Sequence, residues 1–312
     1  MHAVTIVDGQ LEWREHPDPV PGLGEVLVSV RAAGLNGGDL MQRLGFYPAP
    51  PGSPPDIPGL ELAGEVVAAG AGATRFAVGA PVMAVVGGGG QAELAVIHER
   101  MAMPVPDELE WPGAGGFPEV FTTAHDALFS QCHLAMGERV CVHGAAGGVG
   151  LAGVQLAVAA GCEVVATVRN PGLRPAVAAF GATAIEPDEF VAHGPFDVIL
   201  ELIGAPNIAA DLEALATWGR IAVIGVGGGA VAELNLHALM TKRGRIHAST
   251  LRPRPLEEKA IAARRMEAHV LPLVRSGSVR VPVEAALPMA DADAAYARFA
   301  AGGKLGKIVL VT

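Results

Sequence analysis

A glycine-rich turn at residues 143–150 is the segment whose residue types point most directly to chemistry. The strand-like run Arg139–Val142 leads into it, and the apolar, helix-length run Leu151–Ala160 follows at once. Glycine lets backbone N–H groups approach a phosphate, and a helix N-terminus stabilises negative charge. The order alanine-x-glycine-x-x-glycine is the dinucleotide fingerprint with alanine at its first position. We expect a pyrophosphate to bind against Gly144, Ala145, Ala146, Gly147, Gly148, Val149 and Gly150. The alternative is a turn of a parallel sheet that binds no ligand.

The residue after the next strand distinguishes the two nicotinamide cofactors. The run Glu163–Val168 predicts that strand, and Arg169 follows it, with Arg174 five residues further on. An acidic side chain at this place holds the ribose 2′-hydroxyl of NAD, whereas a guanidinium pairs with the 2′-phosphate of NADP. The two arginines therefore favour NADPH. The alternative is a solvated arginine pair at a loop.

Strands and helices alternate over residues 113–251, which places the turn in a doubly wound α/β domain. Strand-like runs lie near residues 139–142, 164–168, 196–200, 220–225 and 244–250, with helical runs between them. Strands separated in this way form a parallel sheet covered on both faces, and a dinucleotide binds at the carboxyl ends of its strands. Glycines that follow later strands let a cofactor pass close to the backbone. These are Gly204 and the segment Gly225-Val226-Gly227.

The preceding segment, residues 1–112, has the pattern of a β-rich domain. Residues 26–31 alternate like a strand, and short apolar runs at 64–70 and 81–86 are bounded by glycine and proline. Short strands with frequent turns predict a barrel or a sandwich. Residues 252–312 are expected to return to this domain and to supply a charged helix at 256–269 and a final strand at 307–311.

Composition excludes several classes of protein. Apolar residues make up 51% and charged residues 17% of the 312-residue chain, which is enough for two cores. The net charge of −10 argues against a nucleic-acid surface. The most apolar window, residues 140–161, changes its period midway and does not predict a membrane span. No secretory leader pattern opens the chain, so a cytoplasmic location is the expectation. The three cysteines and ten histidines show no metal-ligand spacing, and no metal site is expected.

Several segments together resemble one family. They are residues 36–48 (NGGDLMQRLGFYP), 58–64 (PGLELAG) and 78–79 (VG), in addition to the glycine turn. These are similar to the zinc-independent medium-chain dehydrogenase/reductases, and to the quinone oxidoreductases among them. Residues 116–124 and 249–259 further resemble the branch that includes a tumour-suppressor-inducible quinone oxidoreductase. The resemblance runs from about residue 4 to the C-terminal strand.

The departures from the zinc-bearing members of this superfamily have a chemical consequence. Those enzymes place a cysteine ligand near the position of Asn36 and a Gly-His-Glu motif where residues 59–61 read Gly-Leu-Glu. Asparagine and leucine do not replace thiolate and imidazole as zinc ligands. The four-cysteine structural lobe is also missing. The resemblance therefore implies reduction of activated acceptors rather than zinc-dependent oxidation of alcohols.

The resemblance also implies roles for individual residues. It places a GroES-like domain before the Rossmann-type sheet, Thr123 near the nicotinamide carboxamide, and Asn36 and Tyr47 around the acceptor. A hydroxyl such as that of Tyr47 can donate a hydrogen bond or a proton to an acceptor oxygen. Packing in a proline-rich loop is the alternative for this tyrosine. Arg252 and Arg254 are expected in a solvated loop, and a role in shaping the cleft is the alternative. The family's lysine and tyrosine near the 2′-phosphate align with Leu173 and Pro187, so that site would be built differently here.

Three functions remain open from the sequence. The first is reduction of quinones by NADPH, and the second is reduction of the C=C bond of an enone or enoyl thioester, which needs the same hydrogen bond to an oxyanion. The third is a protein that binds NADPH for a structural or regulatory purpose. A small-molecule substrate, no nucleic acid, no membrane span and a homodimer complete the expectation.

Overall fold

The computed structural model describes residues 1–312, which form two compact units. The first comprises Met1–Thr122 together with Leu251–Thr312, and the second comprises Thr123–Thr250. The sequence pattern changes near residue 112, ten residues before the structural division. The difference arises because the short helix α2 (Trp111–Gly115) packs on the β-rich unit, where Gly115 lies so close to Ala32 that a Cβ atom would collide with it.

A seven-stranded sheet forms the core of the first unit. Its strand order is β14-β15-β3-β4-β5-β7, with β6 also paired to β3. Side chains alternate along β3, so that Val26, Val28 and Val30 are buried. The strands are β3 (Glu25–Gly34), β4 (Glu61–Ala69), β5 (Pro81–Val85), β6 (Leu94–His98), β7 (Ala102–Pro104), β14 (Val283–Pro288) and β15 (Lys307–Val311). The hairpin of β1 (His2–Val7) and β2 (Gln10–Glu15) forms a separate two-stranded sheet, and β1 is hydrogen-bonded to the segment that leads into β6.

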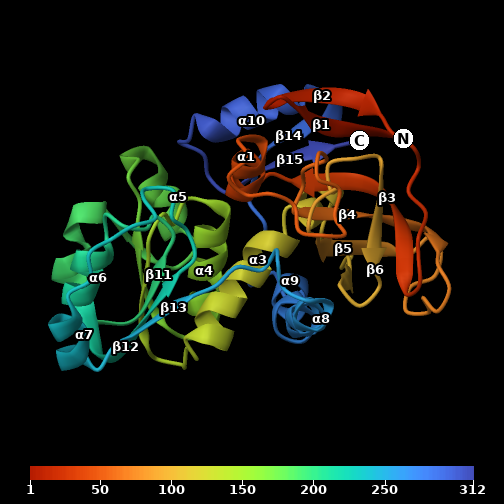
Figure 1. Ribbon diagram of the computed structural model, residues 1–312. Helices are drawn as coiled ribbons and strands as arrows, with labels where there is room; N and C mark the ends of the chain where they lie inside the picture. The colour runs from red at the N-terminus through yellow and green to blue at the C-terminus, as the bar shows by residue number, and fades with distance from the viewer. The chain divides into compact units, whose positions relative to one another are not determined.

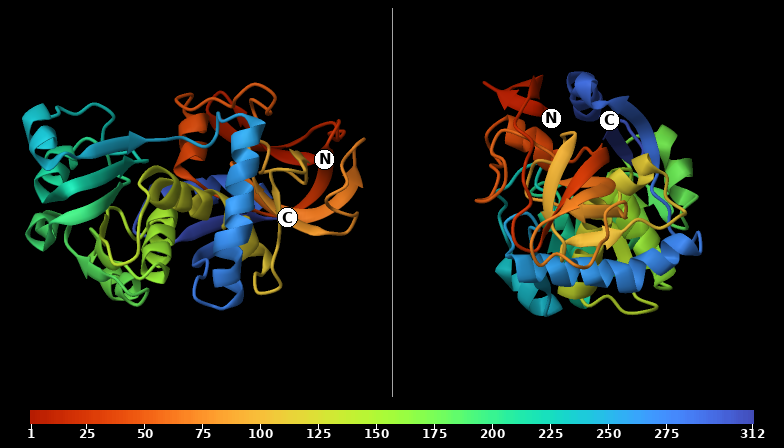
Figure 2. Two further views of the ribbon diagram at one scale, coloured as in Figure 1. Left: turned by 90° about the horizontal axis from the view of Figure 1, so that it is seen from below. Right: turned by 90° about the vertical axis from the view of Figure 1, so that its right-hand side faces the viewer.

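The first unit also contains several helical elements. Helix α10 (Ala292–Ala300) buries Tyr296 in the core. Helix α8 (Leu256–Arg265), a π-helical turn (Met266–Val270) and α9 (Leu271–Arg275) follow one another as a single rod (Figure 2). The remaining elements are α1 (Gly37–Arg43) and a 3₁₀ turn (Met289–Asp291). Helix α3 (Pro118–His125) begins in this unit and ends in the next.

The second unit is a six-stranded, fully parallel sheet in the order β10-β9-β8-β11-β12-β13. Its strands are β8 (Arg139–Val142), β9 (Glu163–Thr167), β10 (Thr183–Ile185), β11 (Phe196–Glu201), β12 (Leu215–Val223) and β13 (Arg245–Ala248). The crossovers through α4 (Gly148–Ala159) and α6 (Ile208–Ala214) run in opposite directions from the centre of the sheet. Right-handed crossovers therefore place these helices on opposite faces (Figure 1). The predicted α/β class with a doubly wound parallel sheet is confirmed.

Shorter helical elements complete the second unit. They are the π-helix Asp126–Gln131, the 3₁₀ turns Pro171–Leu173 and Pro187–His193, α5 (Arg174–Ala178) and α7 (Leu236–Lys242). The sequence pattern placed a helical run directly before the strand predicted over 220–225. The helix instead ends at Ala214, because Leu215 joins β12 opposite Phe196 and both side chains are buried. No helix combines the length and apolar character that a bilayer span requires.

Candidate functional site

The glycine turn connects β8 to α4 as the fingerprint predicts. Helix α4 begins at Gly148, and its N-cap, Gly147, provides no side-chain cap to the free N–H groups of the first turn. A Cβ atom at Gly150 would lie 2.6 Å from the Ala145 Cα, so only glycine fits there. Residues 146–149 are partly exposed. The turn therefore presents unpaired donors at a helix N-terminus and fits the pyrophosphate of a dinucleotide.

The later glycines lie at the same carboxyl edge of the sheet. A Cβ atom at Gly144 would come within 3.1 Å of the Ile203 side chain, so the first turn borders the segment that contains Gly204. Gly225 packs against the backbone of Leu202 without room for a Cβ atom. Val226 is 50% exposed, and Gly227 faces open space. The structure thus brings all the predicted glycine segments of the second unit together.

The two arginines after β9 have different surroundings. Arg169 is exposed and makes no hydrogen bond or ion pair. Arg174 donates from Nε to the Val168 carbonyl at 3.1 Å and from Nη2 to Glu186 Oε1 at 2.6 Å. Its charge is therefore already paired, and Arg169 is the guanidinium that remains free for a phosphate.

Two hydroxyl groups among the predicted site residues have no hydrogen bond in the structure. Tyr47 lies after α1 and is partly buried, and Thr123 lies in α3 and is 8% exposed. Burial and the nearby Glu119 carboxyl raise the pKa of Tyr47, although the Arg252 guanidinium opposes them. The Tyr47 hydroxyl is therefore protonated at neutral pH and able to donate.

Asn36 belongs to a buried hydrogen-bond network in the first unit. Its Nδ2 donates to Glu61 Oε1 at 2.8 Å and to the Gly34 carbonyl at 3.2 Å. Lys307 Nζ donates to Asn36 Oδ1 at 2.7 Å, to Glu61 Oε1 at 2.6 Å and to the Leu35 carbonyl at 2.7 Å. Both amide protons of Asn36 are thus engaged, and the side chain can offer a bound molecule only an acceptor lone pair.

Two carboxyl groups beside this network hold protons near neutral pH. Burial raises the pKa of Asp39 to about 7, even though its oxygens accept from the N–H groups of Asn36 at 2.8 Å and Gly59 at 3.0 Å. Burial and the Glu61 carboxylate raise the pKa of Glu119 to about 8. The Glu119 N–H in turn donates to Glu61 Oε2 at 2.8 Å. The Asp39 and Glu119 carboxyl groups near Asn36 therefore carry less negative charge at neutral pH than exposed carboxylates do.

The solvated loop predicted for Arg252 is wrong, because Arg252 is 3% exposed. Its guanidinium donates to the carbonyls of Gly87 at 2.7 Å and Tyr47 at 2.5 Å, and to Gln42 Oε1 at 2.6 Å. It also lies 4.8 Å from the centroid of the Tyr47 ring. Arg252 therefore fixes the position of Tyr47 from two directions. Arg254 is partly buried and lies 3.8 Å from Glu258.

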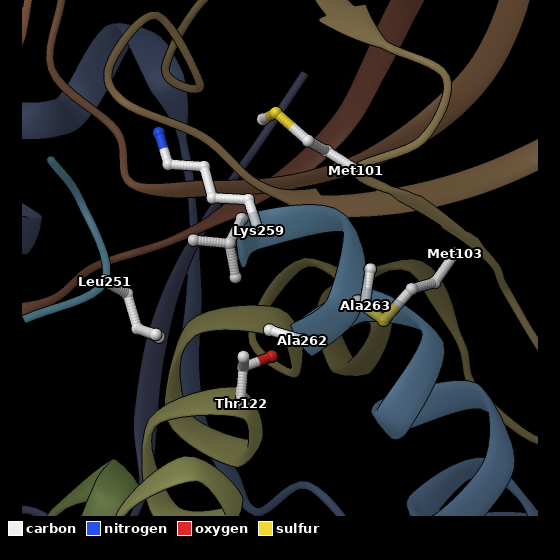
Figure 3. A pocket seen from close by; sticks show the side chains of 8 residues that line it. Met101, Met103, Thr122, Leu251, Lys259, Ala262 and Ala263 are labelled. Carbon is white, nitrogen blue, oxygen red and sulfur yellow. The ribbon is translucent and has the colours of Figure 1, made fainter. Parts of the chain in front are cut away.

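A small cavity is lined by Thr122 of α3, by three residues of α8 and by Leu251, the residue before Arg252 (Figure 3). Its volume of about 20 Å³ holds a water molecule but no quinone ring. Thr122 Oγ1 is buried there without a hydrogen-bond partner, beside Ala262. The Lys259 ammonium group turns away from both. This cavity suits a single water that would satisfy Thr122, and it is not an acceptor site.

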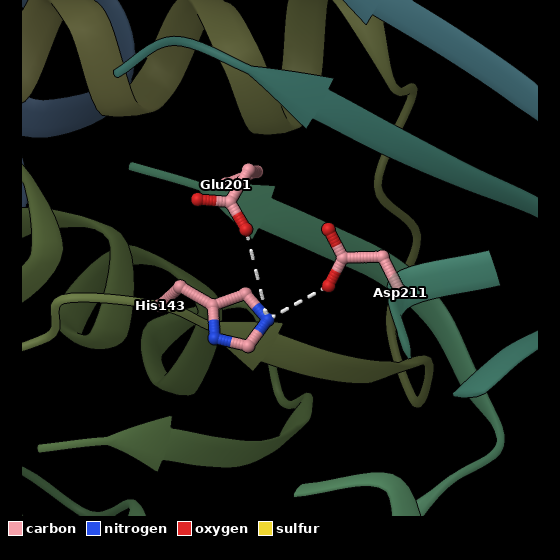
Figure 4. A group of neighbouring side chains, drawn as sticks. All are labelled: His143, Glu201 and Asp211. Carbon is pink, nitrogen blue, oxygen red and sulfur yellow. Dashed lines mark hydrogen bonds and ion pairs between the residues drawn. The ribbon is translucent and has the colours of Figure 1, made fainter. Parts of the chain in front are cut away.

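A second buried polar cluster was not predicted from the sequence. His143, Glu201 and Asp211 are fully buried in the second unit, and their polar atoms lie within 4.8 Å of one another (Figure 4). The signal that could have found it is a histidine at the end of an apolar strand, directly before the glycine turn. For Lys307, the corresponding signal is a charged residue that opens the apolar strand 307–311.

Comparisons with known proteins identify the family. Residues 22–107 match the family model of the alcohol dehydrogenase GroES-like domain, and residues 180–310 match that of a zinc-binding dehydrogenase. The chain is 30% identical over 312 residues to a quinone oxidoreductase from Pseudomonas aeruginosa, a match that covers 96% of this chain and 95% of that protein. The chain belongs to the medium-chain dehydrogenase/reductase superfamily. The resemblance predicted from the motifs is confirmed, and the protein is an oxidoreductase of this superfamily.

Other relatives extend the comparison. The chain is 28% identical to an acryloyl-coenzyme A reductase from Metallosphaera sedula, with 96% of both proteins covered. A 38% identical match to the polyketide synthase GfsB from Streptomyces halstedii covers 65% of this chain but 4% of that protein's length. A mycobacterial protein solved in complex with NADPH superposes with a TM-score of 0.88 at 28% identity over 100% of both chains. The superfamily fold thus accommodates a nicotinamide cofactor.

The zinc ion implied by one of these family models does not fit the residues present. At the positions where zinc-bearing relatives place ligands, this chain has Asn36, Leu60 and Glu61. The Lys307 ammonium group already lies within 2.7 Å of Asn36 Oδ1 and Glu61 Oε1. A fixed cation at hydrogen-bond distance repels a metal ion, and leucine offers no ligand atom.

Proposed function

We propose that this protein is an NADPH-dependent oxidoreductase that transfers hydride to quinones without zinc. The observation that carries the proposal is the free Tyr47 hydroxyl, which burial keeps protonated and which Arg252 holds in place. The relationship to quinone oxidoreductases supports the acceptor class. Arg169, free of any acidic partner, supports the choice of NADPH over NADH.

The chain's own residues divide the work between binding and charge stabilisation. Bound NADPH would supply the hydride. The N–H groups at the start of α4 bind the pyrophosphate, and Arg169 binds the 2′-phosphate. A quinone that accepts hydride develops negative charge on an oxygen. The Tyr47 hydroxyl donates to that oxygen, and Asn36 accepts a hydrogen bond from the carboxamide N–H of the nicotinamide.

Reduction of an enone or enoyl thioester is the second candidate, and the acryloyl-coenzyme A reductase relative favours it. Hydride then adds to the β-carbon, and the resulting enolate oxygen needs the same donor. In both reactions the Tyr47 hydroxyl donates to the oxygen that gains negative charge. An experiment therefore has to distinguish the two classes of acceptor.

A substrate panel separates these functions. NADPH consumption is measured with ortho- and para-quinones, with simple enones and with crotonyl-CoA, and NADPH binding is measured in parallel by fluorescence titration. Turnover with quinones well above turnover with enoyl substrates supports the proposal. Turnover with enoyl substrates alone selects the second function. Tight NADPH binding with no turnover identifies a cofactor-binding regulatory or structural protein instead.

Two further properties complete the proposal, the oligomeric state from the family resemblance and the location from the sequence. We infer a homodimer in the cytoplasm, a compartment that agrees with three unpaired cysteines. Light scattering of the purified protein tests the dimer, and fractionation of the source cells tests the location.

A further inference from the structure

A buried network joins the carboxyl ends of β8, β9 and β11 directly beneath the glycine turn. Its central residue is His143, which directly follows β8 and precedes Gly144. Figure 4 shows the carboxylates of Glu201 and Asp211 both facing one nitrogen of the His143 ring, Nε2. All three side chains are at most 1% exposed. So costly an arrangement of buried charges requires a compensating set of hydrogen bonds.

His143 supplies bonds in two directions. Its Nε2 lies 2.9 Å from Asp211 Oδ1 and 3.9 Å from Glu201 Oε2, and its Nδ1 lies 3.0 Å from Thr167 Oγ1. The edge of the ring faces Phe190 at a centroid distance of 4.6 Å. His143 therefore ties the start of the glycine turn to the end of β9 and to α6.

The Glu201 carboxylate accepts the remaining hydrogen bonds of the network. Its Oε1 accepts from the backbone N–H groups of Ile203 and of Gly204, the latter at 2.7 Å, and its Oε2 accepts from Asn207 Nδ2 at 2.9 Å. One carboxylate thus holds both amides of the segment that follows β11. That segment borders Gly144 through the Ile203 side chain. His143 and Glu201, which are neighbours in this cluster, therefore fix the glycine turn and the 202–204 segment respectively.

The distances favour hydrogen bonds over a metal ion in this cluster. Ligand atoms about 2.1 Å from a zinc ion lie roughly 3.4 Å apart. The 2.9 Å separation of His143 Nε2 and Asp211 Oδ1 is shorter and matches a charge-assisted hydrogen bond. Asp211 Oδ2 is buried without a hydrogen-bond partner. A proton on this oxygen, toward Glu201, would balance the single cationic imidazolium against two carboxyl groups.

We propose that His143, Asp211 and Glu201 are positioning residues that hold the 143–150 turn and the 202–204 segment in the shape that receives a nicotinamide cofactor. The inference rests on the proposed binding of such a cofactor at the glycine turn. Within this network, the backbone N–H groups that Glu201 holds belong to the 202–204 segment, which would face parts common to NADPH and NADH. The network therefore sets the affinity for both cofactors by the same factor, whereas Arg169 acts on NADPH alone.

The test uses full-length protein with Glu201→Ala, Glu201→Gln and Asp211→Asn. Dissociation constants for NADPH and NADH are measured by fluorescence titration, and kcat and KM by NADPH consumption. Glu201→Ala weakens both cofactors by an equal factor of about 10 to 100, which corresponds to hydrogen bonds to a charged group. Glu201→Gln restores most of this affinity, because its amide oxygen still accepts from both N–H groups. Asp211→Asn raises KM for the cofactor more than it lowers kcat.

Asp197→Ala is the matched control. Asp197 Oδ2 accepts from the Arg139 N–H at 2.9 Å, so it joins β11 to β8 at the amino ends of these strands. This variant lowers the thermal midpoint while leaving both dissociation constants unchanged. Equal loss of affinity in Asp197→Ala and Glu201→Ala overturns the proposal, because general destabilisation then explains both.

Other outcomes also decide the matter. Unchanged affinities in folded Glu201→Ala and Asp211→Asn overturn this inference and leave the proposed function intact. Stoichiometric metal in the purified protein, lost in Asp211→Asn, overturns it in favour of a metal site. If the unaltered chain binds neither cofactor, both the proposed function and this inference fail.

Discussion

Lys307 Nζ lies 2.6 Å from Glu61 Oε1, and both side chains are buried, at 3% and 0% exposed. The ammonium group also donates to Asn36 Oδ1 and to the Leu35 carbonyl, so all three of its protons are used. It contacts Asn36 and Glu61, two residues that the sequence resemblance aligns with metal-ligand positions of zinc-bearing relatives. A fixed protein cation and its three acceptors therefore form a closed hydrogen-bond network inside this unit.

Replacing Lys307 by methionine is expected to destabilise the protein by about 3–5 kcal/mol, because it leaves a buried carboxylate without its partner. Urea unfolding measures this loss. The control is Arg31→Met, which breaks the exposed Arg31–Glu65 pair in the same sheet and costs at most about 1 kcal/mol. Similar losses in the two variants would show that the Lys307 network is no stronger than a surface ion pair.

Tyr47→Phe is expected to lower kcat about 100-fold while changing NADPH affinity little, because it removes the donor to the developing oxyanion. Steady-state kinetics with a quinone and NADPH titration measure the two effects. Tyr296→Phe is the matched control, since Tyr296 is the chain's other tyrosine and its hydroxyl donates to Gln91 in the core. Loss of NADPH binding with kcat unchanged in Tyr47→Phe would remove the role assigned to this residue.

Arg169→Ala is expected to weaken NADPH by about 1.5–3 kcal/mol and to leave NADH almost unchanged, because it removes a hydrogen bond to a charged group. Arg174→Ala has a smaller effect on NADPH, since Glu186 already pairs with that guanidinium. Dissociation constants for both cofactors test the pair of variants. Equal effects of Arg169→Ala on NADPH and NADH would refute the phosphate assignment.

The raised pKa of Glu119 predicts a pH dependence of stability. A carboxyl whose folded pKa of about 8 exceeds its unfolded value contributes stability that is complete below pH 4.5 and is lost as the pH rises through 8. The Glu119→Gln variant lacks this pH-dependent contribution to the free energy of unfolding. The urea midpoint of the variant is therefore expected to fall less than that of the native chain between about pH 5 and pH 8. Parallel curves for the two proteins over this range would contradict the assignment.

Local patterns predicted the fold and the cofactor turn. The glycine spacing at 144–150, the parallel strands and the return of the C-terminal strand to the first unit are all readable over a few residues. The buried network of Lys307, Asn36 and Glu61 could not be predicted. Lys307 and Asn36 are 271 residues apart, and no local pattern at either residue indicates its partner. Arg252 was misplaced for the same reason, since its acceptors at Gln42, Tyr47 and Gly87 are distant in sequence.

The most direct test is turnover by metal-free protein. The chain is dialysed against a chelator, its zinc content is verified by elemental analysis, and NADPH consumption is followed with an ortho-quinone before and after zinc is restored. Our account predicts the same kcat/KM in both states. A protein that reduces no quinone until zinc is added would contradict it.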